Sequence, residues 1–305
     1  MKKKIIPFII LLVFAILGYI FLRGQISELK KIFEVSIIYV LLISLMKMVN
    51  VFFRGLKIKI ATKLYGANLE FKEWFGLNYV ATLWNYLTPF KAGTSAMAVY
   101  LKKKYSLPYT FWVSLVGVLF IAQCLIFGLL GFFLVLFLPF LKELRYGLII
   151  FFIAIFLISM FILFFLPLPI KVNIKIIRHI ANSISEFKRA RNFSFILKMI
   201  LLDILRVIAL ASSIYFVFKA FNFNASFCAC MILVIFLELS IVINLTPMSL
   251  GTREAIIIII SRLMGADISI GVLVAALDRS LSIGGTLIFA PIFSYLIFKK
   301  KKNLA

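Results

Sequence analysis

The 305-residue sequence is poor in the residues on which most enzymes depend. It contains 1 histidine, 3 cysteines and 11 acidic residues. The sequence motifs of zinc proteases, serine hydrolases and nucleotide-binding loops are absent, and a single histidine offers no general base with a partner. The cysteines all fall in apolar segments, where a disulfide or a zinc site is not expected. We therefore expect no enzyme, no ATP-driven pump, no metal and no cofactor.

Apolar segments make up most of the chain instead. Hydrophobic residues account for 64% of the sequence, the mean hydropathy is +1.13, and several apolar segments exceed the roughly 18 residues that suggest a membrane-spanning helix. No polar or Gly/Ser-rich linker divides the chain, so we expect one integral all-α membrane domain over residues 1–305. The expected apolar segments are Ile5–Leu22, Val35–Phe53, Trp74–Pro89, Phe111–Leu138, Gly147–Leu166, Ile196–Phe218, Phe227–Leu245 and Gly271–Phe298.

Two of these segments end in a repeated phrase. LTPFKAGT begins at Leu87 and LTPMSLGT at Leu245, and the two are identical at five of eight positions. The prolines, Pro89 and Pro247, remove a backbone donor and disfavour helix in the preceding residue, while the glycines, Gly93 and Gly251, permit a turn that other residues resist. A shorter apolar stretch follows each phrase. The pattern predicts two broken helices, around residues 85–101 and 244–262.

The distribution of lysine and arginine decides how these broken helices cross the membrane. If both turn back as re-entrant hairpins, 22 basic residues fall on the cytoplasmic side and 7 outside. That cytoplasmic count includes all basic residues from Arg54 to Lys72. If both span the bilayer instead, the count becomes 15 against 14. We therefore predict about six full transmembrane helices and two re-entrant hairpins in a multi-pass cell-membrane protein, with both termini cytoplasmic.

In this topology one hairpin enters from each side, so the two repeats are related by inversion. Inverted repeats whose broken helices meet near the bilayer midplane are typical of transporters, because interrupted backbone is tolerated there only inside protein or along a cavity. The net charge of +23 reflects topology and contact with anionic lipid. No nucleic-acid-binding module is indicated, and membrane lipids with anionic headgroups are the expected partners.

Nine charged residues remain at membrane depth once the loops are set aside. Such charges usually pair or line a polar cavity, since each costs roughly 3 kcal/mol near the bilayer centre. Asp203 and Arg206 are spaced as a pair on one helix, and Lys47 can extend toward the membrane surface. The other six lie on the broken segments or on neighbouring helices: Lys91, Glu238, Arg253, Glu254, Asp278 and Arg279.

The sequence Gly251-Thr252-Arg253-Glu254 begins the returning half of the second broken helix. A helix start carries unpaired N–H groups and suits an anion such as phosphate, to which Arg253 can add a bidentate contact. The structural alternative is that Arg253 only pairs with Asp278 or Glu238 and holds the hairpin in place. In the first repeat the positions that match Thr252, Arg253 and Glu254 are uncharged, and Lys91 lies just before them. They are Thr94, Ser95 and Ala96.

These motifs resemble the lysylphosphatidylglycerol synthase transmembrane region, also called the flippase-like domain family. The resemblance covers nearly the whole chain, although this chain has Thr94 and Met97 where family members commonly have Glu and Arg. It implies a membrane protein that moves a charged or glycosylated lipid between leaflets. The matching residues are Asn85, Thr88, Pro89 and Gly93 in the first break, Pro247, Gly251, Arg253 and Glu254 in the second, and Arg279 in the last helix.

Three functions thus stay open from the sequence. The first is a flippase or scramblase for an anionic, aminoacylated or glycosylated lipid. The second is a proton-coupled transporter of a small solute, suggested by Glu238, Glu254 and Asp278; these carboxylates also leave carboxylate catalysis as the one enzymatic alternative. The third is a non-transporting partner of a lipid-modifying synthase or a glycosyltransferase, suggested by the basic cytoplasmic face.

Overall fold

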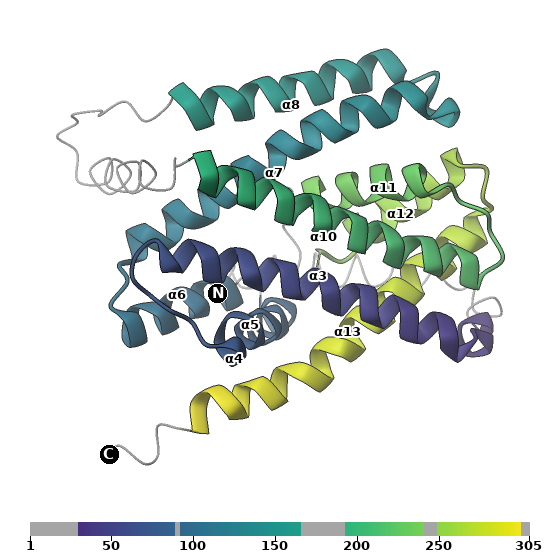
Figure 1. Ribbon diagram of the computed structural model, residues 1–305. Coiled ribbons are helices and arrows are strands. Elements are labelled where there is room, and N and C mark those ends of the chain that lie inside the picture. Colours follow the sequence, from purple (N-terminus) through teal and green to yellow (C-terminus); the bar gives the residue numbers. More distant parts are fainter. Residues whose placement is uncertain (1–29, 89–91, 166–192, 241–248, 300–305) are drawn as a thin grey trace, which may run out of the picture.

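The computed structural model describes residues 30–88, 92–165, 193–240 and 249–299 (Figure 1), and in these ranges every regular element is a helix. Helix formation is expected for apolar segments in a membrane, because a helix satisfies its own backbone hydrogen bonds. The helices are η1 (Lys30–Glu34), α3 (Ile37–Lys63), α4 (Phe71–Trp74), α5 (Gly76–Leu87), α6 (Ala92–Tyr105), α7 (Tyr109–Phe137), η2 (Pro139–Leu141), α8 (Arg145–Phe165), α10 (Phe193–Ala220), α11 (Phe227–Leu239), α12 (Thr252–Leu263) and α13 (Ile268–Phe298).

Five of the described helices, α3, α7, α8, α10 and α13, are long and apolar enough to cross a membrane. They confirm a polytopic all-α membrane protein. The sixth predicted span, Ile5–Leu22, lies outside the described residues. One boundary is corrected: the segment predicted to end at Phe53 continues as α3 to Lys63, because the basic residues Arg54 and Lys57 are accommodated inside the protein.

The long helices pack in pairs (Figure 1). α3 lies along α10, α7 lies along α8, and α13 crosses the bundle to contact both α5 and α12. The short helices form two groups: α5 packs against α6, and α11 packs against α12. Each group consists of two helices that are separated in the sequence by most of one repeated phrase, and the residues between them lie largely outside the described ranges.

The described residues form two hydrophobic cores, one around each group of short helices. The first contains α11 and α12 together with parts of the long helices, and the second contains α4, α5 and α6. Four long helices contribute to both cores through different segments. For example, α10 places Met199 in the second core and Ile214 in the first, and α7 places Leu115 in the second and Phe127 in the first.

Charged and amide side chains fall between the two cores on each of these long helices. We call this region the polar band. On α3 it lies between Ile43 of the first core and Ala61 of the second, and on α13 between Leu277 and Ala290. Its members are Lys47, Asn50, Arg54 and Lys57 on α3, Gln123 on α7, Asp203 and Arg206 on α10, Glu238 on α11, Arg253 and Glu254 on α12, and Asp278, Arg279 and Ser282 on α13.

The two predicted helix breaks differ in their backbone geometry. Gly251 has φ = +87° and directly precedes α12, a conformation that glycine adopts without strain. Gly93, expected to permit a turn, lies instead inside the first turn of α6. A Cβ atom there would lie 1.9 Å from the carbonyl oxygen of Ala81, so the missing side chain allows α6 to approach α5. The predicted helix breakers Pro89 and Pro247 lie outside the described residues.

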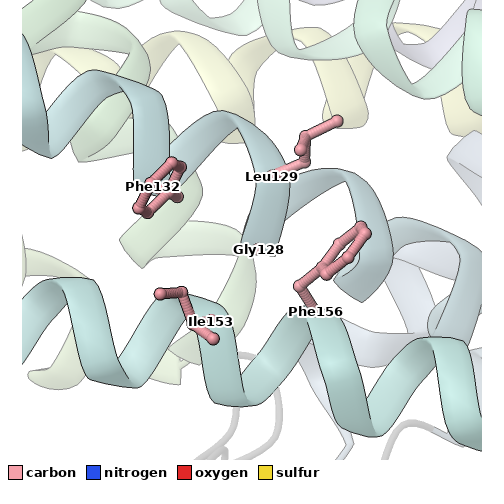
Figure 2. Close-up of a pocket in the computed structure, with 5 residues that line it drawn as sticks. All are labelled: Gly128, Leu129, Phe132, Ile153 and Phe156. Carbon is pink, nitrogen blue, oxygen red and sulfur yellow. The ribbon is translucent and has the colours of Figure 1, made fainter.

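The α7–α8 pair contains an apolar pocket of about 190 Å³, shown in Figure 2. Close approach of the two helices depends on Gly128, where a Cβ atom would lie 2.7 Å from the backbone nitrogen of Phe156. Because no polar side chain lines this pocket, it does not suit a charged headgroup. Its lining residues are Gly128, Leu129, Phe132, Ile153 and Phe156.

Candidate functional site

The first part of the polar band is centred on the carboxylate of Asp278. Lys47 forms an ion pair with Oδ1 of Asp278 and donates a second hydrogen bond to Ser282 Oγ at 2.8 Å. Arg253 donates from Nη2 to Oδ2 at 3.1 Å. Lys47 lies about 15 Å from the start of α3, which is about 40 Å long, so this carboxylate is held well inside the span. Two cations from two helices therefore share one buried anion of α13.

Glu254 and Arg279 form a second ion pair between the same two helices, α12 and α13. Arg279 donates from Nε to Glu254 Oε1 at 2.8 Å, and the backbone N–H of Gly251 donates to Oε2 at 2.8 Å. Glu254 thus satisfies one free N–H group at the start of α12 and also binds α13. Thr252 donates its hydroxyl to the carbonyl of Ser249 at 3.1 Å, which closes the turn before the helix.

The second part of the polar band is nearly sealed. Asp203 accepts hydrogen bonds from Lys57 at 2.6 Å and from Arg206 at 3.0 Å, and Arg206 also donates to Glu238 at 2.8 Å. Two amide side chains complete this network: Gln123 donates to Glu238 at 2.9 Å, and Asn50 accepts from Arg206 at 3.2 Å. The network ties α3, α7, α10 and α11 together.

Exposure separates the two parts. The side chains of Arg253 and Glu254 are each 27% exposed, whereas those of Lys57 and Asp203 are 4% and 1% exposed. The side chain of Glu238, which pairs with Arg206, is 12% exposed and so lies between these values. A ligand can therefore reach the polar band at the start of α12. The buried network around α10 instead holds the helices together.

The six cations of the polar band outnumber its four carboxylates, so two positive charges are not balanced within it. Arg54 contributes to this excess, because its described hydrogen-bond partners are neutral: Asn78 Oδ1 at 2.9 Å, Thr82 Oγ1 at 3.0 Å and the Asn78 carbonyl at 3.4 Å. An excess of buried positive charge favours an anionic ligand. Within the described ranges, no group of three or more His, Cys, Asp or Glu side chains is placed to hold a metal ion.

At the first helix break the two short helices are joined by neutral hydrogen bonds, without an ion pair among the described residues. Asn85, near the end of α5, accepts a hydrogen bond from the backbone N–H of Thr94 at 3.3 Å and donates to its hydroxyl at 3.4 Å. These contacts join α5 to the first turn of α6, as the Glu254 contacts join α12 to α13. Lys91, the remaining candidate of this break, lies outside the described residues.

The structure brings together most of the candidates that the sequence indicated. Arg253 contacts Asp278 and Glu254 contacts Arg279, whereas Glu238 pairs with Arg206 of the α10 network. The structural alternative for Arg253 is therefore realised in part, since it does pair with Asp278.

Sequence reasoning did not assign three cations to the polar band. Lys47 is directed into the protein rather than toward the membrane surface, and Arg54 and Lys57, counted among the cytoplasmic residues, belong to α3. The useful signal was their spacing: residues 47, 50, 54 and 57 recur at intervals of three and four, which places them on one face of a helix.

A separate polar cluster lies outside the spans, where α4 meets the end of α6. The fully buried carboxylate of Glu73 accepts hydrogen bonds from Tyr100 and Lys104, from Tyr105 at 2.5 Å and from the backbone of Glu70 at 2.9 Å. Burial raises the pKa of Glu73, but these hydrogen bonds outweigh it and hold the pKa below its usual value. The cluster fastens the end of α6 to the start of the α4–α5 segment.

The comparisons with known proteins agree with this architecture. The family model described as "Lysylphosphatidylglycerol synthase TM region" matches residues 6–290, nearly the whole chain. No curated protein and no solved structure matches the sequence.

Proposed function

Because this multi-pass membrane chain belongs to the lysylphosphatidylglycerol synthase transmembrane region family, we propose that it moves a lipid with a charged headgroup between the leaflets of the cell membrane. The lipid is anionic, aminoacylated or glycosylated. The observation that carries the proposal is the accessible edge of the polar band, where Arg253 and Glu254 are each 27% exposed beside the buried Asp278. A charged headgroup crossing the bilayer needs such a polar site at depth.

In the proposed mechanism the site lies between two re-entrant hairpins, one at each helix break. α5 and α6 form one re-entrant hairpin and α11 and α12 the other, entering from opposite sides with both termini cytoplasmic. The described parts of both hairpins contact or contribute to the polar band: Glu238 lies in the last turn of α11, Arg253 lies in the first turn of α12, and Thr82 of α5 accepts a hydrogen bond from Arg54. Irregular backbone at this depth is tolerated where it lines a cavity.

In the proposed cycle the headgroup enters between the hairpins while the acyl chains stay in the bilayer. An anionic headgroup competes with Asp278 for Arg253, and Asp278 keeps Lys47 as its counter-ion, so no carboxylate is left unpaired. Thr252 and the backbone around Gly251 supply further polar groups. Since this chain carries no ATPase motif, lipid movement is either downhill or coupled to an ion gradient.

The experiment is leaflet exchange of labelled anionic, aminoacylated and glycosylated lipids in proteoliposomes. The wild type is compared with Arg253→Ala and with Arg262→Ala, which removes a 63% exposed arginine from the other end of α12. We expect exchange that depends on the headgroup, that is lost in Arg253→Ala and that is retained in Arg262→Ala. Equal exchange by both variants and the wild type would refute the assignment of the site.

A proton-coupled solute transporter is the second candidate, motivated by the carboxylates of Glu238, Glu254 and Asp278. Each of them is ion-paired: Glu238 with Arg206, Glu254 with Arg279, and Asp278 with two cations. Protonating such a carboxylate during transport would leave its cation unpaired at depth, which is costly. The ion pairs therefore favour the lipid proposal. Solute uptake that is driven by a pH gradient and abolished by Asp278→Asn would favour the solute transporter over the lipid transporter.

A non-transporting role beside a lipid-modifying synthase or a glycosyltransferase is the third candidate. It would be favoured if the protein purified in constant proportion with such an enzyme and moved no lipid by itself. Membrane lipids with anionic headgroups remain the proposed partners in either case.

A further inference from the structure

Lys47 and Arg253 share one carboxylate but differ in how far solvent reaches them. Lys47 forms an ion pair with Oδ1 of Asp278, and Arg253 donates to Oδ2 at 3.1 Å. The side chain of Arg253 is 27% exposed, against 15% for Lys47 and 3% for Asp278. Arg253 is therefore the more accessible of the two cations, and Lys47 is the more enclosed.

Lys47 is held in this position by a second contact on α13. Its ammonium donates to Ser282 Oγ at 2.8 Å, and Ser282 donates its hydroxyl to the carbonyl of Asp278 at 2.7 Å. Because the hydroxyl uses its one proton for that carbonyl, its oxygen is left to accept from Lys47. Lys47 therefore has two partners one turn apart on α13, and this arrangement keeps its ammonium beside Asp278 independently of Arg253.

The ion pairs at the accessible edge of the polar band leave one positive charge over. Glu254 is paired with Arg279, whereas Asp278 is paired with both Lys47 and Arg253. A buried carboxylate that loses its last cation is costly, but Asp278 has two. One of them can therefore leave without stranding the carboxylate, and the more exposed Arg253 is the one placed to do so.

We propose that Lys47 is a positioning residue of the headgroup site: it keeps the charge of Asp278 compensated and thereby frees Arg253 to bind an anionic headgroup. Lys47 does not contact the headgroup itself. Without Lys47, Arg253 would be the last described cation on a carboxylate that is 3% exposed, and a headgroup would have to remove it. This role rests on the proposed lipid transport and deepens it by naming the residue that makes the site selective for anions.

Two other roles for Lys47 lead to different expectations. If Lys47 bound the headgroup directly, its removal would weaken binding whether or not Asp278 was ionised. If Lys47 only stabilised the fold, binding of anionic and neutral lipids would fall together. In the positioning role, loss of Lys47 weakens the binding of anionic lipid alone. Removing the charge of Asp278 as well then restores binding, because Arg253 no longer has a carboxylate to leave.

The test is binding of defined lipids to the purified full-length chain in dodecyl maltoside, measured by native mass spectrometry. The probes are phosphatidylglycerol, whose headgroup carries one negative charge, and the neutral diacylglycerol. Wild type should prefer phosphatidylglycerol by about tenfold or more, as expected for one charge-assisted contact. Lys47→Met should lose most of this preference, Lys47→Met/Asp278→Asn should regain it, and Lys47→Arg should keep most of it. Lys63→Met, which removes an exposed lysine from the same helix, is the matched control and should bind like the wild type.

A wild-type preference in folded Lys47→Met overturns the proposal, as does a double variant that does not regain the preference. If Lys47→Met does not fold, Lys47→Gln takes its place under the same criteria. Asp278→Asn is also measured alone. Since this substitution frees Arg253, it should bind phosphatidylglycerol at least as tightly as the wild type, and weaker binding overturns the proposal.

Arg253→Ala separates this proposal from the site on which it rests. A lost preference in Arg253→Ala together with a wild-type preference in Lys47→Met refutes only the role of Lys47. A wild-type preference in Arg253→Ala, or equal binding of both probes by the wild type, refutes the headgroup site and the role of Lys47 with it. Leaflet exchange is measured separately, and Lys47-dependent binding without exchange refutes only the transport proposal.

Discussion

Nη2 of Arg253 lies 3.1 Å from Oδ2 of Asp278, while Lys47 binds the other oxygen of the same carboxylate. Three helices, α3, α12 and α13, are therefore joined through one buried side chain. Asp278 is 3% exposed, so solvent does not compensate for the loss of this charge. The Asp278 carboxylate and the Glu254–Arg279 ion pair thus both hold the start of α12 against α13.

Asp278→Asn should destabilise the protein by about 3 kcal/mol or more, because it leaves Lys47 and Arg253 without the buried anion that they share. The measurement is the unfolding free energy in mixed detergent and SDS, followed by circular dichroism. Asp267→Asn is the matched control: Asp267 is 82% exposed and lies 3.9 Å from Arg262, a pair that contributes about 0.5 kcal/mol or less. Equal effects of the two variants would contradict the central role of Asp278.

Lys57→Met should destabilise by a similar amount, because Asp203 then keeps only Arg206 as a cationic partner. Adding Asp203→Leu should recover part of the loss, since the buried carboxylate that has lost one of its two cations is removed and Arg206 still binds Glu238. Stability is compared in a double-mutant cycle, with Lys63→Met as the control at an exposed position of α3. Strictly additive effects of the two substitutions would mean that the Lys57–Asp203 ion pair contributes nothing to stability.

Gly93→Ala should disrupt the α5–α6 pair. A Cβ atom at Gly93 would lie 1.9 Å from the Ala81 carbonyl oxygen, so the helices must separate, at a cost of about 1–3 kcal/mol or more. Gly117→Ala is the control: Gly117 lies inside α7 with no atom within 4 Å of the added Cβ, and alanine there should stabilise the helix by up to about 1 kcal/mol. Thermal unfolding of both variants checks the prediction, which fails if Gly93→Ala melts at or above the wild-type temperature.

Glu73 should make stability depend on pH. Its pKa is depressed in the folded protein, so its contribution is present above the unfolded pKa of about 4.3 and is lost as the pH falls through the lower folded value. Glu73→Gln should therefore melt below the wild type at pH 7, and this difference should shrink as the pH is lowered below about 4. Melting curves of both proteins between pH 7 and pH 3 test the effect. A difference that stays constant over this range would rule out titration of Glu73.

The sequence predicted the broken helices and several charges of the site for local reasons. Proline and glycine act on the backbone around them, and Gly251 does adopt a positive φ. Arg253, Glu254, Asp278 and Arg279 stood out because charges are unexpected in apolar segments. The same local reasoning failed for α3, where Arg54 and Lys57 were assigned to a loop. A helix can continue through basic residues when partners elsewhere in the chain accept their charge, and those partners are invisible in a local window.

Composition and hydropathy by themselves determined that this protein is an all-α membrane protein, since long apolar segments can satisfy their backbone in lipid only as helices. Only the tertiary structure decided which charges meet. Lys47 pairs with a residue 231 positions away and Lys57 with one 146 positions away. A helical period fixes the face on which a side chain lies but not the helix that faces it. The polar band exists because folding aligns four long helices so that their charged segments coincide between two hydrophobic cores.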